Sequence, residues 1–213
     1  MAQVLFIKGH PANADSSVSL TLADHFMAAY CMAHASDKIT TVDLYHDYIP
    51  LIDADVLSAW DKLRFGHAAN ITPSEHAKLS RLSELSDQFV ASDKYIFAAP
   101  MWNMGYPPMV KAYVDGAMIV QGKTFAYTDH GPVALLRGQG RKALILEASG
   151  GQYIGTPMED HTAASRYLEG MLKYIGIDDV EVITAEGMAQ LPEQRGAIIQ
   201  AADARAVKLD DTF

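Results

Sequence analysis

The stretch VLFIKGHPANADSSVSL at residues 4–20 decides the fold class, because it contains a buried strand, a polar loop and the start of a helix. Residues 4–7 form a continuous apolar run, which is typical of a strand covered on both faces. The sequence KGHP at 8–11 ends this run. From Val18 onward, apolar residues recur at steps of three and four, which predicts a helix with one apolar face.

This strand–loop–helix unit recurs along the chain. Further buried strands are predicted at 39–44, 95–99, 143–148 and 180–185. Helices are predicted at 18–33, from a Thr72 capping box to Phe89, at 108–120, 164–175 and 193–209. Five strands alternating with helices indicate an α/β protein, expected to be one domain over 1–213. We expect a three-layer sandwich with a five-stranded parallel sheet of flavodoxin-type order 2-1-3-4-5 and helices on both faces.

One segment exceeds this minimal pattern. Between the second strand and Thr72, the residues Val56, Trp60 and Leu63 recur at helical spacing behind Asp53, a typical helix cap. The sequence therefore predicts an added helix at 53–65. Two interpretations stay open for it: a cover over the edge of the sheet, or a dimer contact or active-site wall.

Composition excludes several classes of protein. The 213 residues are 49% hydrophobic, which is ordinary for a globular chain. With 17 Lys and Arg against 26 Asp and Glu, the net charge of −9 repels nucleic acid and anionic lipid. No apolar run approaches the roughly 18 residues of a membrane span. The single Cys31, expected to be a small buried or half-buried residue, suits a reducing compartment, so a cytoplasmic location is predicted.

The first of three unusual loops suits a phosphate group. Ligands of open parallel sheets bind beyond the carboxyl ends of the strands, where the strand order reverses. The loop after the first strand places Ser17 and Ser19 at a helix start, where free N–H groups and the helix dipole favour an anion. His10 in the same loop is either a donor to that anion or a structural residue. Alternatively, Ser16 or Ser17 is simply the cap of the helix, so both interpretations stay open.

The other two loops suit a flat ring. After the third strand comes PMWNMGYPP at 100–108, whose flat and apolar side chains can pack along a heterocycle while Asn103 bonds its polar edge. A turn stiffened by proline is the alternative. After the fourth strand comes ASGGQY at 148–153, whose paired glycines let N–H groups approach ring carbonyl oxygens. Together the three loops describe flavin mononucleotide, FMN.

Other chemical motifs are absent from the sequence. It has no G-x-x-x-x-G-K-[ST] loop, and GQGRKA at 138–143 runs into a strand instead of leaving one, so it is not a dinucleotide fingerprint. The eight histidines show no metal-binding spacing, and no metal is expected.

Four motifs carry a family resemblance that extends over almost the whole chain. They are the S-x-S at 17–19, PMWN at 100–103, GKTFAYTDHGP at 122–132 and SGG at 149–151. They resemble the motifs of the FMN-dependent NADH-azoreductases, which belong to the flavodoxin-like quinone reductases. The resemblance implies a homodimer with two FMN sites near its interface. It also implies a ping-pong reaction in which NADH or NADPH delivers hydride to flavin N5, after which a quinone or azo compound takes two electrons.

The resemblance also implies roles for residues. Ser17, Ser19 and the amide between them would hold the phosphate, the 101–103 stretch would flank the ring, and 149–151 would meet its pyrimidine edge. The expected cofactor-binding residues are His10, Ser17, Val18, Ser19, Pro100, Met101, Trp102, Asn103, Met104, Ser149, Gly150 and Gly151. The residues expected to face the substrate are Tyr127, Phe125 and Tyr153, with Tyr127 on its own subunit or across the dimer. No side chain is expected to be a nucleophile; Asn103 and Gly151 would orient and tune the flavin.

Two departures from the family pattern stand out. At the exit of the first strand, where some members carry a serine that touches phosphate, this chain has Gly9 and His10. Where many members have Asn-Phe, it has Asn103 and Met104. Two other classes also stay open: a non-enzymatic flavodoxin-type electron carrier, and a flavin-independent phosphodiester hydrolase, which would need a nucleophile or metal cluster.

Overall fold

The centre of the molecule is a parallel sheet of five strands. The computed structural model describes residues 1–210 and 213. The strand order is β2-β1-β3-β6-β7, with every neighbouring pair parallel. The strands are β1 (Gln3–Lys8), β2 (Lys38–Asp43), β3 (Lys94–Pro100), β6 (Lys142–Ala148) and β7 (Asp179–Ala185). Counted within this sheet alone, the order is 2-1-3-4-5, so the predicted topology is confirmed.

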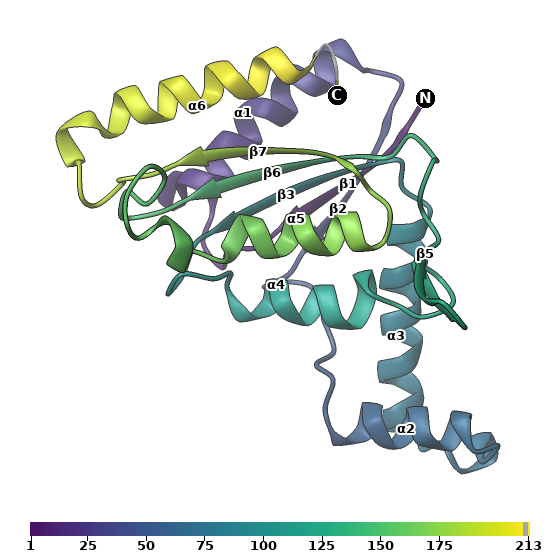
Figure 1. Cartoon of the computed structure of the whole chain (residues 1–213). Helices are drawn as coiled ribbons and strands as arrows, with labels where there is room; N and C mark the ends of the chain where they lie inside the picture. Colours follow the sequence, from purple (N-terminus) through teal and green to yellow (C-terminus); the bar gives the residue numbers. More distant parts are fainter. Residues whose placement is uncertain (211–212) are drawn as a thin grey trace.

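Helices cover both faces of the sheet, as Figure 1 shows. Helices α1 and α6 lie on one face, and α3, α4 and α5 lie on the other. The α-helices are α1 (Val18–Ala33), α2 (Ala54–Arg64), α3 (Pro73–Val90), α4 (Pro108–Tyr113), α5 (Ala164–Tyr174) and α6 (Arg195–Asp210). Short 3-10 turns are η1 (Ala14–Ser16), η2 (Ala68–Asn70), η4 (Glu159–His161) and η5 (Pro192–Gln194).

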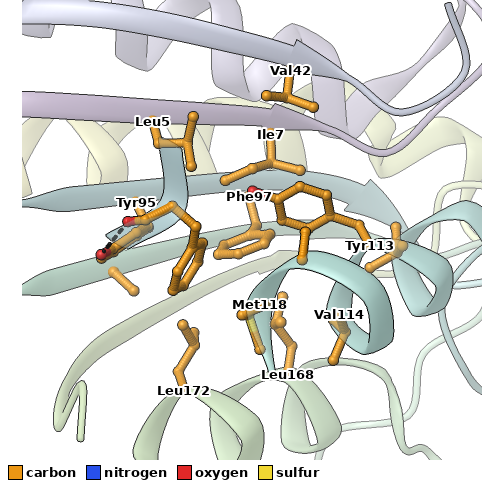
Figure 2. Close-up of a cluster of buried hydrophobic side chains, with 14 of the residues drawn as sticks. Leu5, Ile7, Val42, Tyr95, Phe97, Tyr113, Val114, Met118, Leu168 and Leu172 are labelled. Atoms are coloured by element: carbon orange, nitrogen blue, oxygen red, sulfur yellow. Dashed lines mark hydrogen bonds between the residues drawn. The ribbon is translucent and has the colours of Figure 1, made fainter. Parts of the chain in front are cut away.

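The alternation of side chains along the strands builds two apolar cores. In β1, Leu5 and Ile7 face the layer of α3, α4 and α5, whereas Val4 and Phe6 face α1 and α6. Figure 2 shows the first core, where Tyr95, Phe97, Tyr113, Met118, Leu168 and Leu172 fill the space between the sheet and the helices. Both faces of β1 are therefore buried, as its continuous apolar run predicts.

The added helix α2 begins as predicted but lies elsewhere than a sheet cover would. The Asp53 side chain accepts a hydrogen bond from the Val56 N–H at 3.2 Å, which caps the helix. The predicted Thr72 capping box is present, and Lys62 on α2 pairs with the buried Glu75 of that box at 2.7 Å. Helix α2 packs against α3 and extends away from the sheet (Figure 1), so the interpretation as a cover over the sheet edge is wrong.

Two elements were not foreseen. The segment expected as one helix over 108–120 is α4 followed by a π-helical turn, η3 (Val114–Met118). The GKTFAYTDHGP motif forms an antiparallel hairpin of β4 (Phe125–Thr128) and β5 (Gly131–Ala134) outside the main sheet. In Figure 1, this hairpin lies at the end of the molecule where the parallel strands begin.

The environment of Cys31 differs from the expectation. Its side chain is exposed, and the neighbouring Met32 is 85% exposed. Tyr30 is fully buried on the core face of α1, and one residue along a helix is a rotation of about 100°, which turns Cys31 toward solvent. No helix in the described part of the chain is long and apolar enough to cross a membrane.

Candidate functional site

The loop after β1 brings two serine hydroxyls together at the start of α1. Ser17 is the N-cap residue, but its side chain makes no capping hydrogen bond. Its Oγ lies 3.1 Å from the Oγ of Ser19, and both residues are buried. The first N–H groups of a helix have no partner within the helix, so those of Val18 and Ser19 point in the same direction. The cap interpretation of Ser17 is therefore not borne out, and the local donors suit an anion.

His10 connects this loop to the next one. Its Nδ1 accepts a hydrogen bond from the Ala12 N–H at 2.9 Å, and burial lowers the pKa of the ring. The neutral ring therefore carries its proton on Nε2, which is free to donate. The edge of the His10 ring meets Trp102 at a centroid distance of 5.9 Å. On the other side, Tyr45 lies 6.4 Å from Trp102.

Gly9, which precedes His10, lies in a crowded position. A Cβ atom at this position would lie 2.7 Å from Val110 Cγ2 and 2.8 Å from Ala99 Cβ. Helix α4 and strand β3 therefore approach the β1 exit closely.

The loop after β3 contains a strained two-residue turn. Trp102 and Gly105 exchange backbone hydrogen bonds of 2.8 and 3.0 Å, with Asn103 and Met104 between them. Asn103 has φ 49° and Met104 φ 67°, and they are the two non-glycine residues with positive φ in the described chain. This conformation costs a residue with a side chain about 1–2 kcal/mol. The turn holds Trp102 and Asn103 exposed at the rim of the sheet.

Backbone hydrogen bonds fix this turn to its neighbours. Met101 N–H donates to the carbonyl of Ala148 at 2.9 Å, which joins the loop to the end of β6. Ala163 N–H donates to the carbonyl of Met104 at 2.7 Å, which joins it to the start of α5. Pro100 is the last residue of β3. The turn is thus held from two sides, which explains how a strained conformation persists.

The loop after β6 presents N–H groups from two glycines. Its carbonyl groups at Ser149, Gly150 and Gly151 all accept backbone hydrogen bonds from the segment 187–190. The buried Ser149 hydroxyl also donates to the Gly151 carbonyl at 2.8 Å. Within residues 1–210 and 213, no group accepts from the N–H of Gly150 or Gly151. The loop is therefore firmly held by its acceptors and leaves two donors for a ligand.

The residues expected to face the substrate fall into two places. Tyr153 lies at the rim, and its ring would come within 2.9 Å of a Cβ at Gly151, so the ring packs closely over this glycine. Tyr127 and Phe125 belong to β4, at the opposite end of the sheet from the three loops. Tyr127 is 65% exposed, whereas Phe125 is 8% exposed beneath Tyr127 and Tyr174. Within one chain, β4 does not meet the rim, and Phe125 does not present its ring to a substrate.

A large groove lies away from the three loops. Its volume is about 1020 Å³, and it runs between α2, α3, η3 and the start of β4. Its walls include Leu57, Trp60, Leu82, Ile119 and Phe125. None of the residues of the three loops lines it.

Sequence reasoning missed two polar groups beneath the rim. Glu147 in β6 is 5% exposed, and the hydroxyl of Tyr106, just after the strained turn, is buried. A carboxylate inside the otherwise apolar run 143–148 was a signal that the strand pattern alone passed over. Within the described residues, no group of three or more His, Cys, Asp or Glu side chains is arranged to hold a metal ion.

The residues present at the rim fit FMN. The paired hydroxyls of Ser17 and Ser19 and the helix start suit its phosphate. The exposed Trp102 and Asn103 suit the flank of a flat ring, and the N–H groups of Gly150 and Gly151 suit its carbonyl oxygens. The strained backbone stands at this rim, where strain commonly accompanies a binding role.

Comparison with known proteins gives likenesses over the whole length of the chain. A family profile described as the flavodoxin-like fold matches residues 2–209. FMN-dependent NADH:quinone oxidoreductase 3 of Halalkalibacterium halodurans is 42% identical over 214 residues, covering 100% of both chains. FMN-dependent NADH:quinone oxidoreductase 2 of Bacillus subtilis is 40% identical with the same coverage.

A solved structure agrees with these sequences. The FMN-dependent NADH-azoreductase from Bacillus anthracis, determined in complex with FMN, is 33% identical. It covers 99% of this chain and 100% of its own, with a TM-score of 0.89. The chain therefore belongs to the flavodoxin-like fold family, within the group of the FMN-dependent NADH:quinone oxidoreductases.

Proposed function

We propose that this protein is an FMN-dependent NADH:quinone oxidoreductase that also reduces azo compounds. The observation that carries the proposal is the meeting of three loops at one sheet edge, with the strained turn at Asn103 and Met104 held between the other two. When bound, FMN supplies the ring that accepts hydride from NADH and passes two electrons to the acceptor. The side chains of this protein bind and orient, and none forms a covalent bond.

The phosphate-binding role is assigned to the start of α1. The hydroxyls of Ser17 and Ser19 and the N–H of Val18 would donate to phosphate oxygens, supported by the positive end of the helix dipole. The Nε2–H of the neutral His10 would add a donor from the preceding loop. Because a phosphate is charged, each such hydrogen bond is stronger than one between neutral groups.

The ring-binding role is assigned to the other two loops. Pro100 and the stretch Met101, Trp102, Asn103 and Met104 would flank the ring, with the Asn103 amide at its polar edge. Ser149 holds the glycine loop, so that the N–H groups of Gly150 and Gly151 stay fixed. Preorganised donors at this edge stabilise the negative charge that the ring gains on reduction, which tunes its potential.

A homodimer is proposed because one chain separates the expected substrate residues from the rim. Tyr127 lies at the opposite end of the sheet, so it can reach a cofactor only on a second copy. The groove beside α2 and exposed apolar side chains such as Leu57 and Phe65 give that copy a surface to bury. Phe125 supports Tyr127 from below, and Tyr153 faces the substrate from the rim itself.

The electron-carrier alternative is not favoured, because the relatives at 40–42% identity are named as oxidoreductases. The flavin-independent hydrolase gains no support either, since the rim offers hydrogen-bond donors instead of an activated nucleophile. The use of NADPH as a second donor, the single-domain organisation and the cytoplasmic location stay predictions.

The visible spectrum of the purified protein tests the proposed function. We expect the absorption of bound FMN, its bleaching on addition of NADH without oxygen, and its return on addition of a quinone. A protein that is colourless and takes up no added FMN would contradict the proposal. A bound flavin that NADH alone does not reduce would favour the carrier.

Mixed dimers test the role across subunits. Subunits with Ser17→Ala and Ser19→Ala should lose FMN, and subunits with Tyr127→Ala should keep it but turn over quinone more slowly. A hybrid of the two regains one complete site if Tyr127 acts on the cofactor of the other copy. Activity of the mixture equal to the average of the two variants would show that Tyr127 acts within its own chain or not at all.

A further inference from the structure

Glu147 is a buried carboxyl group with no role in the reaction as described so far. It is the second-last residue of β6, and it is 5% exposed. It shares the sheet face of Ala143 and Ile145, which pack into the core with α5. Burying a carboxylate is costly unless the group is paired or becomes neutral.

The surroundings of Glu147 do not pair its charge. Two groups stabilise the ionised form of Glu147: the Ser165 N–H at the start of α5 and the Tyr106 hydroxyl. The nearby Glu186 destabilises it. On the flanking strands, its register neighbours are Ala99 of β3 and Thr184 of β7, which carry no charge. Burial is the largest influence, and it raises the pKa of Glu147 to about 7.

Two buried atoms in this cluster have no partner. Glu147 Oε2 and the Tyr106 hydroxyl oxygen each make no hydrogen bond with any described residue. The two groups are close enough that Glu147 raises the pKa of Tyr106 in addition to its burial, but they are not aligned as donor and acceptor. A proton on Oε2 would give the pair a second donor, so that each unpartnered atom could find a partner.

This cluster lies directly beneath the ring-binding loops. The next residue, Ala148, accepts the hydrogen bond that holds Met101, and Gly150 and Gly151 follow shortly after. The start of α5, which donates to Glu147, also donates through Ala163 to the strained turn. Glu186 binds the N–H groups of Tyr153 and Ile154 at 3.1 and 3.0 Å. Both ring-binding loops are therefore bonded to segments next to Glu147: the loop after β3 to Ala148 and to the start of α5, and the loop after β6 to Glu186.

We propose that Glu147 takes up a proton when the bound cofactor gains electrons, and releases it when the acceptor is reduced. The proposal rests on the proposed function. When bound, the ring would accept hydride, which is two electrons and one proton, from NADH, and the residues around it would then face a more negative charge. A solvent proton then joins Glu147 Oε2, whose O–H donates to the Tyr106 oxygen. Reduction of a quinone takes the hydride and one further proton, which Glu147 gives up, so that NADH, one proton and the quinone yield NAD⁺ and the hydroquinone.

Glu147 is thus a positioning residue that acts through charge, without touching the substrate. An ionised Glu147 beneath the ring opposes electron uptake, whereas a neutral one does not. Proton uptake coupled to reduction has a measurable sign: the potential of the cofactor should fall more steeply with pH wherever Glu147 is ionised before reduction and neutral after it.

The midpoint potential of bound FMN, measured against pH, tests the proposal. Glu147→Gln keeps the shape and an acceptor for Ser165 N–H but cannot ionise. Above about pH 7, the wild-type potential should fall with pH more steeply than that of the variant. The extra slope should be about 30 mV per pH unit, which is a tenfold change in the equilibrium constant of a two-electron couple. Toward about pH 6, where Glu147 is already neutral, the pH dependence of the two proteins should become the same. Exposed Glu181→Gln on β7 is the matched control and should follow the wild type.

A second variant and a second measurement keep the proposal testable if Glu147→Gln does not fold. The Tyr106 oxygen is the proposed acceptor for the Glu147 proton, so Tyr106→Phe should shift the pH at which the steeper slope begins, and an unchanged onset would contradict this pairing. Infrared difference spectra of the wild type at about pH 8 should gain the C=O band of a protonated carboxyl group on reduction.

The outcomes separate the two proposals. Parallel potentials of wild type and Glu147→Gln across the whole range would overturn the role of Glu147, as would the absence of the carboxyl band. A wild-type protein that binds no FMN would instead overturn the proposed function, before any potential is measured.

Discussion

The two ends of the same sheet treat buried polar groups in opposite ways. Where the strands begin, the Tyr30 hydroxyl donates to Asp37 at 2.6 Å and accepts from Lys94 at 2.7 Å. Beside it, Arg141 donates to the Tyr95 hydroxyl at 2.6 Å and to the Val90 carbonyl at 2.9 Å. These contacts tie the start of β3 and the residues before β2 and β6 to the last turns of α1 and α3.

Where the strands end, polar groups are left short of partners. Glu147 Oε2 and the Tyr106 hydroxyl lack them, and Asn103 and Met104 have positive φ. The N–H groups of Gly150 and Gly151 have no acceptor among the described residues. A satisfied network stabilises a fold, whereas unmet donors and strained backbone persist where a ligand or a reaction makes use of them. The contrast teaches that the end where the strands begin stabilises the sheet, whereas the end where they finish is built to bind a ligand.

Removing Arg141 should have the largest effect and should act on stability alone. Arg141→Ala leaves the Val90 carbonyl and the Tyr95 hydroxyl without their charged donor. We expect the free energy of unfolding to fall by about 3 kcal/mol. Urea denaturation measures this, and fluorescence titration should show nearly unchanged FMN affinity. An equal loss of FMN affinity would break the division of labour between the two ends.

Glu147→Gln should change how stability depends on pH. The pKa of Glu147 in the folded protein is about 7, against an ordinary 4.5, so the folded state keeps a proton that the unfolded chain loses. Stability of the wild type should therefore be full below about pH 4.5, fall up to about pH 7, and lose on the order of 2 to 3 kcal/mol in total. Urea denaturation of the variant at about pH 5 and about pH 8 should lack this loss. The same loss in both proteins would assign it to other groups.

Ser17→Ala should weaken FMN binding with little effect on folding. Losing one hydrogen bond to a charged phosphate costs about 1 to 3 kcal/mol of binding. The Ser17 side chain caps nothing and bonds only to the buried Ser19 hydroxyl, so the free energy of unfolding without FMN should fall by no more than about 1 kcal/mol. The matched control is Ser16→Ala in the same loop, whose hydroxyl contacts only Asn13. Reversed results, with stability lost and affinity kept, would restore the cap interpretation.

Met104→Gly should have the smallest effect, and unlike most substitutions it should stabilise the fold. Glycine adopts positive φ freely, and Asn-Gly is the preferred pair for such a turn. After the loss of Met104 packing, we expect a gain of about 0.5 kcal/mol in unfolding free energy, with weaker FMN binding. Thermal denaturation and FMN titration measure the two. A variant that gains stability and binds FMN unchanged would show that the strain has no binding role.

Much of the fold was predictable because it rests on local patterns. The apolar runs at 4–7 and 143–148 and the capping box at Thr72 fix strands and helix starts without reference to distant residues. The parallel order follows from the alternation of strands and helices. The three loops were predictable as a group because parallel strands end at one edge.

Other features depend on tertiary contacts that sequence patterns do not contain. The β4–β5 hairpin is four residues per strand, too short for periodicity to identify. The direction of α2 depends on its packing against α3 and the Lys62–Glu75 pair. Asn103 and Tyr127 lie at opposite ends of the sheet because α4 and η3, which separate them in the chain, run along one face of it. Glu147 was missed because one charge in a buried strand gains meaning only from its neighbours.

The crowding at Gly9 limits which residues can be placed at the β1 exit. A Cβ atom there would overlap both Val110 Cγ2 and Ala99 Cβ, so a serine at the β1 exit requires these neighbours to shift. A smaller residue at position 110 would relieve the shorter of the two overlaps. A library designed to introduce a serine at position 9 should therefore vary positions 9, 99 and 110 together.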